Sequence, residues 1–326
     1  MSSVKPSAKY LMKISHLALS LAIAGCVTGA EVPRVITLSV GQWPEDLVFD
    51  PASGHLFVAD EGSATVTVLK AMGERVGTIR LASRARHLAV DPARGHVYIP
   101  NEGHGFVAVF DTRDLREAFR IPVGPKPHGI AVDTSAHRVF VANEGDDSLT
   151  ALDGGSGQVL FTVPVAHGPG GVAVDPVTSR VFVVSVKQDR VLVIDGARGL
   201  RIEAIAVGRG PTHLRVNVKT GIVYVLNTEA GTVSVLDGRK LSVLTTLAVG
   251  DYPIGIAVDE IAGRIYVINN RSSTLSIVDE AALTIVRTHG IPRNVSSATL
   301  NHEAGLLYLA LKGEDRVAVV RLDDLE

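Results

Sequence analysis

An all-β fold, a β-propeller of seven four-stranded antiparallel blades, is predicted by three observations. A short apolar strand ending in Asp or Asn recurs seven times, with its last residue at Asp50, Asp91, Asp133, Asp175, Asn217, Asp259 and Asn301. The spacing between these residues is 41 once and then 42 five times. Each unit also holds four β-rich segments separated by turns, which is typical of a propeller blade.

Within a unit, the strands follow one another at intervals of about ten residues. The second strand carries an aromatic residue and ends in a polar one, as in Phe57-Val58-Ala59-Asp60. Asp-Pro-x-x-Gly segments such as 50–54 supply turn chemistry between the first two strands. A third strand closes on Asp in most units, and a looser fourth strand, such as 243–247, leads to a Val-Gly turn.

The two ends of the chain predict how the ring closes. The seventh unit stops after its third strand, Val317-Ala318-Val319-Val320, with almost no chain left. Residues 32–40 precede the first unit and resemble a fourth strand, since 36–41 parallels 245–250. We expect the N-terminal strand to complete the last blade, because this pairs two edges that would otherwise be open. The predicted propeller domain is 32–326.

The N-terminus has the features of an export signal. Lys5, Lys9 and Lys13 precede an apolar stretch over 17–27, which is too short to span a membrane. Ile23-Ala24-Gly25-Cys26 resembles a bacterial lipobox. The pattern predicts a signal peptide over 1–25, a lipidated Cys26 and a short linker over 26–31.

The predicted location is therefore the cell envelope. The protein is expected to be an outer-membrane lipoprotein that faces the periplasm and contacts the membrane only through its lipid anchor. The alternative is an ordinary signal cleaved after Ala30, which gives a soluble periplasmic protein. Translation from Met1 or from Met12 stays open.

Composition excludes several classes of function. The 326 residues carry a formal charge of −2, and loss of 1–25 removes three lysines and no acid. Nucleic-acid binding is therefore disfavoured, as it is by an aromatic content of only 5%. A single cysteine excludes an intrachain disulfide framework, a Cys-rich zinc site and a c-type haem attachment. We expect a monomer.

The Tyr-Val-x-Asn strand ends and the preceding Gly-Ile-Ala-Val-Asp strands resemble the YVTN-type, or YncE-like, family of bacterial secreted propellers. The resemblance covers everything after the signal. It implies a seven-bladed propeller that is periplasmic or at the cell surface, in a family where some members are linked to metal or redox metabolism. The architecture is also similar to the streptogramin lyase and lactonase propellers, which are enzymes, although no residue pattern carries their catalytic groups over.

The repeat predicts which residues face the mouth of the central channel. The positions four and five residues before the end of each first strand should line it, and they include Glu45, Asp46, Arg86, His87, His128 and His213. The loop after each second strand adds a second ring, which contains Asn101, Glu102, Asn143 and Glu144. Turn capping by the two Asn side chains and simple solvation of the two Glu side chains are the alternatives for this second ring.

Asp46, His87 and His128 come from three neighbouring blades and form a candidate metal site. Neutral imidazole and carboxylate are suitable ligands for a divalent ion such as zinc, copper or iron. His213 is in the fifth blade, so we expect it across the channel, where it would hold the far side of a small ligand. Arg86 is an alternative anchor for a carboxylate or phosphate.

Two classes of function follow. The first, favoured because no catalytic motif is present, is a binding or scaffold protein for a small ligand, a metal ion or a protein partner at the channel mouth. The second is a metal-assisted lyase or hydrolase that uses the histidines and acids of the same face. The chain contains no His-Glu-x-x-His motif and no phosphate-binding loop.

Overall fold

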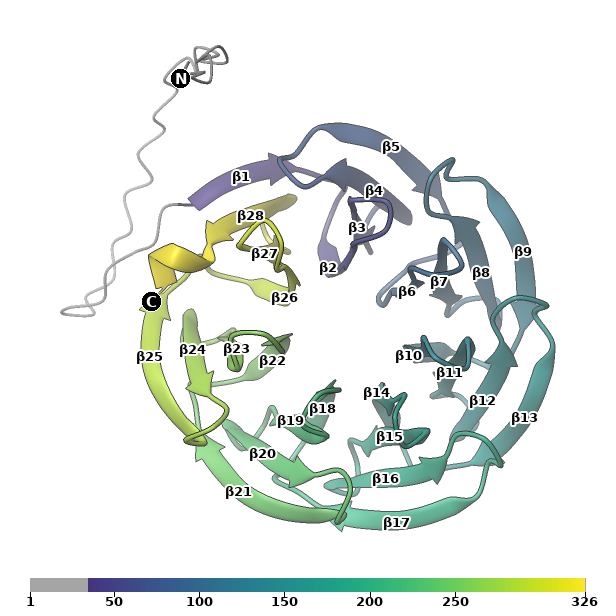
Figure 1. Cartoon of the computed structure of the whole chain (residues 1–326). Helices are drawn as coiled ribbons and strands as arrows, with labels where there is room; N and C mark the ends of the chain where they lie inside the picture. Colours follow the sequence, from purple (N-terminus) through teal and green to yellow (C-terminus); the bar gives the residue numbers. More distant parts are fainter. Residues whose placement is uncertain (1–34, 326) are drawn as a thin grey trace, which may run out of the picture. The chain divides into compact units, whose positions relative to one another are not determined.

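The computed structural model describes residues 35–325, which form a ring of seven blades around a central axis (Figure 1). Each blade is a four-stranded antiparallel sheet whose strands succeed one another from the axis to the periphery. The predicted fold class is thus confirmed. The predicted signal peptide 1–25, the lipidated Cys26 and the linker 26–31 lie outside the described residues.

We number the blades from the first complete unit. Blades one and two contain β2 (Pro44–Asp50), β3 (His55–Asp60), β4 (Thr65–Lys70), β5 (Arg75–Arg80), β6 (Ala89–Asp91), β7 (His96–Asn101), β8 (Phe106–Asp111) and β9 (Glu117–Pro122). Blades three and four contain β10 (Pro127–Asp133), β11 (Arg138–Asn143), β12 (Ser148–Asp153), β13 (Val159–Pro164), β14 (Pro169–Asp175), β15 (Arg180–Ser185), β16 (Arg190–Asp195) and β17 (Arg201–Ala206). Blades five and six contain β18 (Pro211–Asn217), β19 (Ile222–Asn227), β20 (Thr232–Asp237), β21 (Ser242–Ala248), β22 (Pro253–Asp259), β23 (Arg264–Asn269), β24 (Thr274–Asp279) and β25 (Thr284–Gly290). Blade seven contains β26 (Val295–Asn301), β27 (Leu306–Leu311), β28 (Arg316–Arg321) and β1 (Val35–Ser39).

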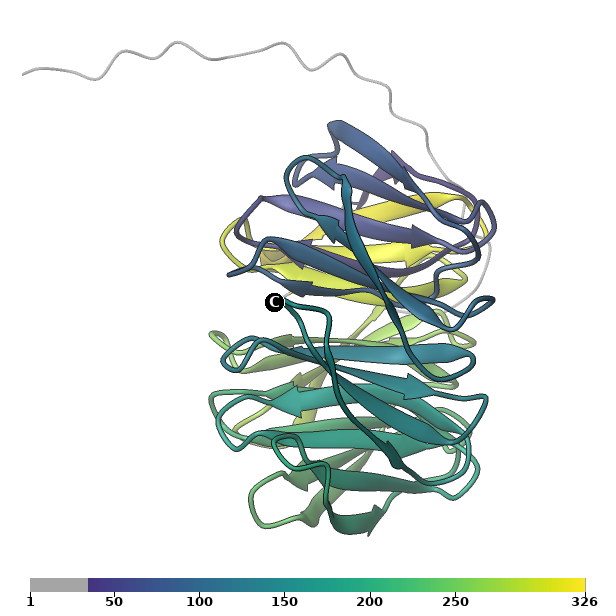
Figure 2. The same cartoon turned by 90° about the vertical axis from the view of Figure 1, so that its right-hand side faces the viewer.

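The ring closes as the sequence predicts. β1 pairs antiparallel with β28, from Val35 opposite Val320 to Ser39 opposite Arg316. A 3-10 helix, η1 (Leu322–Leu325), follows β28 beside this junction. Figure 2 shows the ring edge-on, with connecting loops at both of its faces. Residues 35–325 contain no helix long and apolar enough to cross a membrane.

The core consists of apolar layers between neighbouring blades, and one aromatic position recurs in all of them. The second strand of every blade buries this ring almost completely, at Phe57, Tyr98, Phe140, Phe182, Tyr224, Tyr266 and Tyr308. Some of the tyrosines also link blades, because Tyr98 donates a hydrogen bond to Gly154 O of blade three and Tyr308 donates one to Ala71 O of blade one. The aromatic in the repeat therefore holds adjacent sheets together.

A recurring backbone hydrogen bond fixes the start of the innermost strand in every blade except blade two. In blade one Trp43 has a positive φ of 53° directly before Pro44, and its carbonyl accepts a hydrogen bond from the Glu61 N–H. The same φ and acceptor recur at Lys126 and Tyr252, each also before a proline. The carbonyl thus ties the entry of the first strand to the loop after the second strand, and both lie at the channel mouth.

Blade two lacks this hydrogen bond, and Arg84, the residue equivalent to Trp43, has no positive φ. Ala85 stands where the other blades have Pro or Val, and β6 retains only three residues, Ala89–Asp91. The preceding segment, which contains Arg86 and His87, is therefore not part of a strand. This irregular segment supplies two of the candidate site residues.

A buried polar triad recurs in blades one, three, five and six. A terminal Asp or Asn of the second strand bonds to two hydroxyl side chains of the third strand, as in Asn227 with Thr232 and Ser234. Blade one uses Asp60 in the same place, where it accepts hydrogen bonds from Thr65 and Thr67. The amide and the carboxylate therefore occupy equivalent buried sites.

The triad predicts a pH-dependent stability. Burial raises the pKa of Asp60 to about 6, despite the hydrogen bonds from Thr67, Thr65 and Gly41. The ordinary pKa of this carboxyl is 3.8. The contribution of protonated Asp60 to the free energy of unfolding is therefore complete below about pH 4 and is lost as the pH rises through 6. Asp60→Asn should raise the free energy of unfolding by about 2 kcal/mol at pH 8 and leave it unchanged at pH 4.

Urea denaturation at the two pH values measures this effect, and Asn227→Asp is the matched control, which should introduce the same pH dependence into blade five. A stability difference of Asp60→Asn that does not change with pH would contradict the prediction.

Candidate functional site

Three histidines meet at the centre of the ring. The ring centroid of His87 lies 4.5 Å from that of His128 and 5.4 Å from that of His213. His87 belongs to the irregular segment before β6, His128 to β10 and His213 to β18. We call these three residues the histidine cluster. His213 was expected across the channel from the others, but it contacts His87 because the channel is narrow at this height.

The narrowness follows from small residues in the same register. Of the residues four positions before each strand end, three are Gly129, Gly171 and Gly255, which line a cavity of about 30 Å³ together with His87 and His213. A Cβ atom on Gly129 would lie only 2.1 Å from the carbonyl oxygen of Gly170. Glycine thus lets the inner strands approach closely enough for imidazoles from distant blades to touch.

A β-bulge aims these side chains inward. In most blades the register between the first and second strands shifts near the start of the first strand, between Pro44 and Asp46 in blade one and between Pro211 and His213 in blade five. Bulges of this kind redirect a side chain and are frequent beside functional sites.

Asp46 is a buried carboxylate that orients His87. Its Oδ1 accepts a hydrogen bond from Ser297 Oγ at 2.7 Å, and its Oδ2 accepts one from Leu88 N at 3.3 Å. The same Oδ2 lies 3.5 Å from His87 Nδ1. Burial acts to raise the pKa of Asp46, but His87, the charge of Arg215 and the hydroxyl of Ser297 outweigh it and lower the pKa to about 2.

His128 and His213 are held in the neutral form. Burial, reinforced by the charges of neighbouring groups, lowers the pKa of His213 to about 3 and that of His128 well below 6.5. The Nδ1 atoms of both rings are buried and have no hydrogen-bond partner among the described residues. The cluster therefore presents buried, uncharged ring nitrogens that the protein itself does not satisfy.

A charged rim lies at the mouth of the channel beside the cluster. Lys312 Nζ donates hydrogen bonds to Glu45 at 2.5 Å and to Glu61 at 2.9 Å. Arg86 Nε donates one to Glu61 at 3.0 Å and lies 3.6 Å from Glu102. These five residues, the charged rim, connect blades seven, one and two. Burial alone would raise the pKa of Glu61, but the hydrogen bonds and charges of Lys312 and Arg86 hold this pKa below its ordinary value.

Glu102 is the acid of the rim that has a buried oxygen without a hydrogen-bond donor. Its Oε1 is buried without a hydrogen-bond partner in the described part of the chain and lies 4.0 Å from His128 Nε2. Burial raises the pKa of Glu102 more than the charges of Arg86 and His87 lower it. Glu144, also predicted for this ring, is exposed to solvent and is not paired with the rim.

Asn101 and Asn143 are not brought into the cluster. Asn143 is fully buried, and its Nδ2 donates hydrogen bonds to Ser148 and Thr150 of the polar triad. Asn101 accepts a hydrogen bond from Ser83 at 2.5 Å. Both amides are used inside their blades, which is the turn-capping alternative considered above.

Sequence reasoning did not single out Lys312, Arg215 and Ser297. Lys312 occupies, in blade seven, the loop position that Glu61 and Glu102 occupy in blades one and two, so the repeat register alone could have found it. Arg215 breaks an otherwise uncharged strand position, which was also a visible signal.

No group of three or more His, Cys, Asp or Glu side chains in residues 35–325 is arranged to hold a metal ion. For the predicted set of Asp46, His87 and His128, the physical reason is that Asp46 already accepts hydrogen bonds from Ser297 and a backbone N–H. Its place behind His87 is that of a carboxylate orienting a histidine, not that of a free ligand.

Comparison with known proteins shows the fold. No protein-family model and no curated protein sequence matches the chain. Among solved structures, a chain of Kuenenia stuttgartiensis hydrazine synthase is similar with a TM-score of 0.74 and 19% identity, over 91% of this chain and 99% of that one. The U3-55K structure has a TM-score of 0.78 at 10% identity, over 90% of this chain and 100% of that one.

The WD40 repeats of RRP9 are similar with a TM-score of 0.77 at 10% identity, over 90% of this chain and 99% of that one. At such identities the likeness establishes a seven-bladed propeller, a fold compatible with a binding or scaffold role. It assigns no ligand to the channel.

The buried His213 predicts acid sensitivity. Its pKa is about 3 in the folded protein and 6.5 in the ordinary case, so below pH 6.5 only the unfolded chain takes up this proton. The contribution of neutral His213 to the free energy of unfolding is therefore complete above pH 6.5 and declines as the pH falls toward 3. Between pH 7 and pH 5, His213→Gln should lose about 2 kcal/mol less stability than the wild type. Urea unfolding at both pH values measures this, and equal losses would show that His213 is not held neutral.

Proposed function

We propose that this protein is a non-catalytic binding protein of the bacterial cell envelope, which holds a divalent transition-metal ion at the histidine cluster. The observation that carries the proposal is the pair of neutral imidazoles, His128 and His213, with buried and unpartnered Nδ1 atoms. A buried polar atom without a partner costs about 1–3 kcal/mol. A ligand that accepts the lone pair of a neutral ring nitrogen removes this cost.

A buried acid oxygen beside the cluster favours a cation. The charged rim contains three acids, Glu45, Glu61 and Glu102, and two bases, and a third base, Arg84, lies 3.9 Å from Glu61 at its edge. Deeper in the channel, Asp46 is balanced by the charge of Arg215. With Arg84 included, the formal charges balance, but a buried oxygen of Glu102 is without a donor. A positive ligand would be attracted to this oxygen.

The spacing of the rings suits a shared ion. Two imidazoles that bind one ion through bonds of about 2 Å have ring centres roughly 5 Å apart. The observed centroid distances from His87 are 4.5 Å to His128 and 5.4 Å to His213. In the observed rotamers the three rings are not arranged as a metal site. The terminal torsion of histidine is broad, so the proposal requires a rotation of the rings that directs their nitrogens to one point. Asp46 would then orient His87 from behind, as carboxylates do for metal-bound histidines.

The envelope location rests on the sequence. The lipobox-like segment before Cys26 and the resemblance to YVTN-type propellers support a lipoprotein on the periplasmic side of the outer membrane. The mass of the native N-terminal peptide tests this part of the proposal: a lipidated Cys26 is expected, and an unmodified N-terminus at Glu31 would indicate a soluble periplasmic protein.

Titration calorimetry of chelator-treated protein with Zn²⁺, Cu²⁺ and Ni²⁺ tests the metal site. One ion should bind per chain, and His128→Ala/His213→Ala should abolish binding because two of the three ligands are lost. Asp46→Asn should weaken binding about 10- to 100-fold, since it removes only the orienting carboxylate.

The control for these variants is His55→Ala, because His55, the first residue of β3, bonds to Thr112 O and is not part of the histidine cluster, so its loss should leave metal binding unchanged. The metal site is excluded if none of the three ions binds or if the double variant binds them as the wild type does.

A lyase or hydrolase is the second candidate, favoured by the Asp46–His87 pair. An ionised carboxylate 3.5 Å from an imidazole nitrogen is the arrangement that orients a general base. This function requires turnover that is lost in His87→Gln while the fold is retained, whereas a binding protein shows none.

A further inference from the structure

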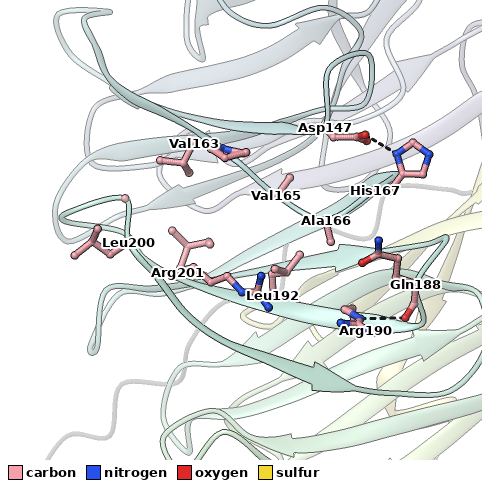
Figure 3. A pocket seen from close by; sticks show the side chains of 13 residues that line it. Asp147, Val163, Val165, Ala166, His167, Gln188, Arg190, Leu192, Leu200 and Arg201 are labelled. Atoms are coloured by element: carbon pink, nitrogen blue, oxygen red, sulfur yellow. Dashed lines mark hydrogen bonds and ion pairs between the residues drawn. The ribbon is translucent and has the colours of Figure 1, made fainter.

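A groove lies between blades three and four, on the outer side of the ring and away from the histidine cluster (Figure 3). Its volume is about 610 Å³, within the range of sites for small organic molecules. β13 forms one wall, and β16 with the turn into β17 forms the floor and the other wall. The lining residues are Asp147, 163–167, Gln188, Arg190, Leu192, Ile194 and 199–201.

The groove coincides with a departure from the repeat. Where blades one, three, five and six carry the polar triad, blade four has Ser185, Arg190 and Leu192. Ser185 donates its hydroxyl hydrogen bond to His167 O, so it does not bond to the third strand. Blades two and seven also lack the triad, but an alanine, Ala108 or Ala318, stands there in place of Leu192.

Part of the groove lining is apolar. Leu192 and Ile194 are buried in β16, and Val163 lies opposite them on β13. Leu200, at one end, is 60% exposed. Gly199 adds no side chain, and a Cβ atom there would lie 2.8 Å from the ring of Phe161. The glycine therefore lets the turn into β17 pack closely against Phe161 of β13 at this end of the groove.

Two guanidinium groups face this apolar floor without a carboxylate partner. Arg190 donates a hydrogen bond only to Gln188 O, and no acid within residues 35–325 pairs with Arg190 or Arg201. Figure 3 shows Arg201 extending toward Leu192 and Arg190 lying beyond it. The acid at the edge, Asp147, is already paired with His167 at 2.5 Å and accepts a hydrogen bond from Gly168 N. Both oxygens of Asp147 are thus hydrogen-bonded within the protein.

We infer that this groove is a second ligand-binding site, which takes a small amphipathic organic anion. Its carboxylate, or an equivalent oxyanion, binds the guanidinium groups of Arg190 and Arg201, whose planar forks match such groups. Its hydrocarbon part covers Leu192, Ile194 and Val163. Arginine binds oxyanions well because guanidinium is weakly hydrated and always charged.

Decanoate, below its micellar concentration, is the probe, and titration calorimetry or saturation-transfer NMR is the measurement. One molecule should bind per chain. Arg190→Ser/Arg201→Ser should weaken binding at least tenfold, and decyltrimethylammonium, with the same tail and opposite charge, should bind at least tenfold more weakly than decanoate. The matched control is Arg198→Ser, which removes an exposed arginine of the same blade that lies near Asp195 outside the groove.

A second variant, Ser185→Asn/Arg190→Ser/Leu192→Thr, introduces the polar triad of blade three into blade four and should abolish binding while the melting temperature shows a folded protein. His128→Ala/His213→Ala should bind decanoate like the wild type, which separates this site from the channel. The inference is overturned if decanoate does not bind saturably, if both groove variants bind it unchanged, or if the cationic amphiphile binds equally well.

Discussion

The candidate site depends on the pairing of β1 with β28, because this pairing closes the ring. Five residue pairs join the start of the described chain to its end. In a closed ring of similar blades, equal positions of the repeat lie at equal heights and distances from the axis. His87 and His213 are far apart in sequence and contact each other only through this geometry. An open ring would leave each imidazole on the inner edge of a separate sheet.

Repetition explains why the fold could be predicted and why the site could be predicted only in part. A period of 42 residues reports the number of blades, the strand order and the height of Asp46, His87 and His213. It does not report the width of the channel, which depends on glycines such as Gly129 and on the length of facing side chains. The contact of His213 with His87 was therefore not foreseen.

The same limit of the repeat pattern explains why sequence reasoning placed two residues wrongly and overlooked a third. Asn101 and Asn143 share the register of the channel loops, but a terminal amide bonds most readily to nearby hydroxyl groups, so they turn into their blades. Lys312 was overlooked because it differs in charge from Glu61 and Glu102, although it has the same register. It completes the rim because opposite charges around one ring can pair across blade boundaries.

Departures from the repeat coincide with the two proposed sites. Blade two has Ala85 in place of the proline or valine of the other blades, and the irregular segment that follows carries Arg86 and His87 to the channel. Blade four, like blades two and seven, lacks the polar triad, and the lateral groove lies at Arg190 and Leu192. In both cases the neighbouring blades keep the regular structure and so support the irregular one. A repeat protein can lose a local stabilising device in one unit because the others hold that unit in place, and the freed positions then become available for binding.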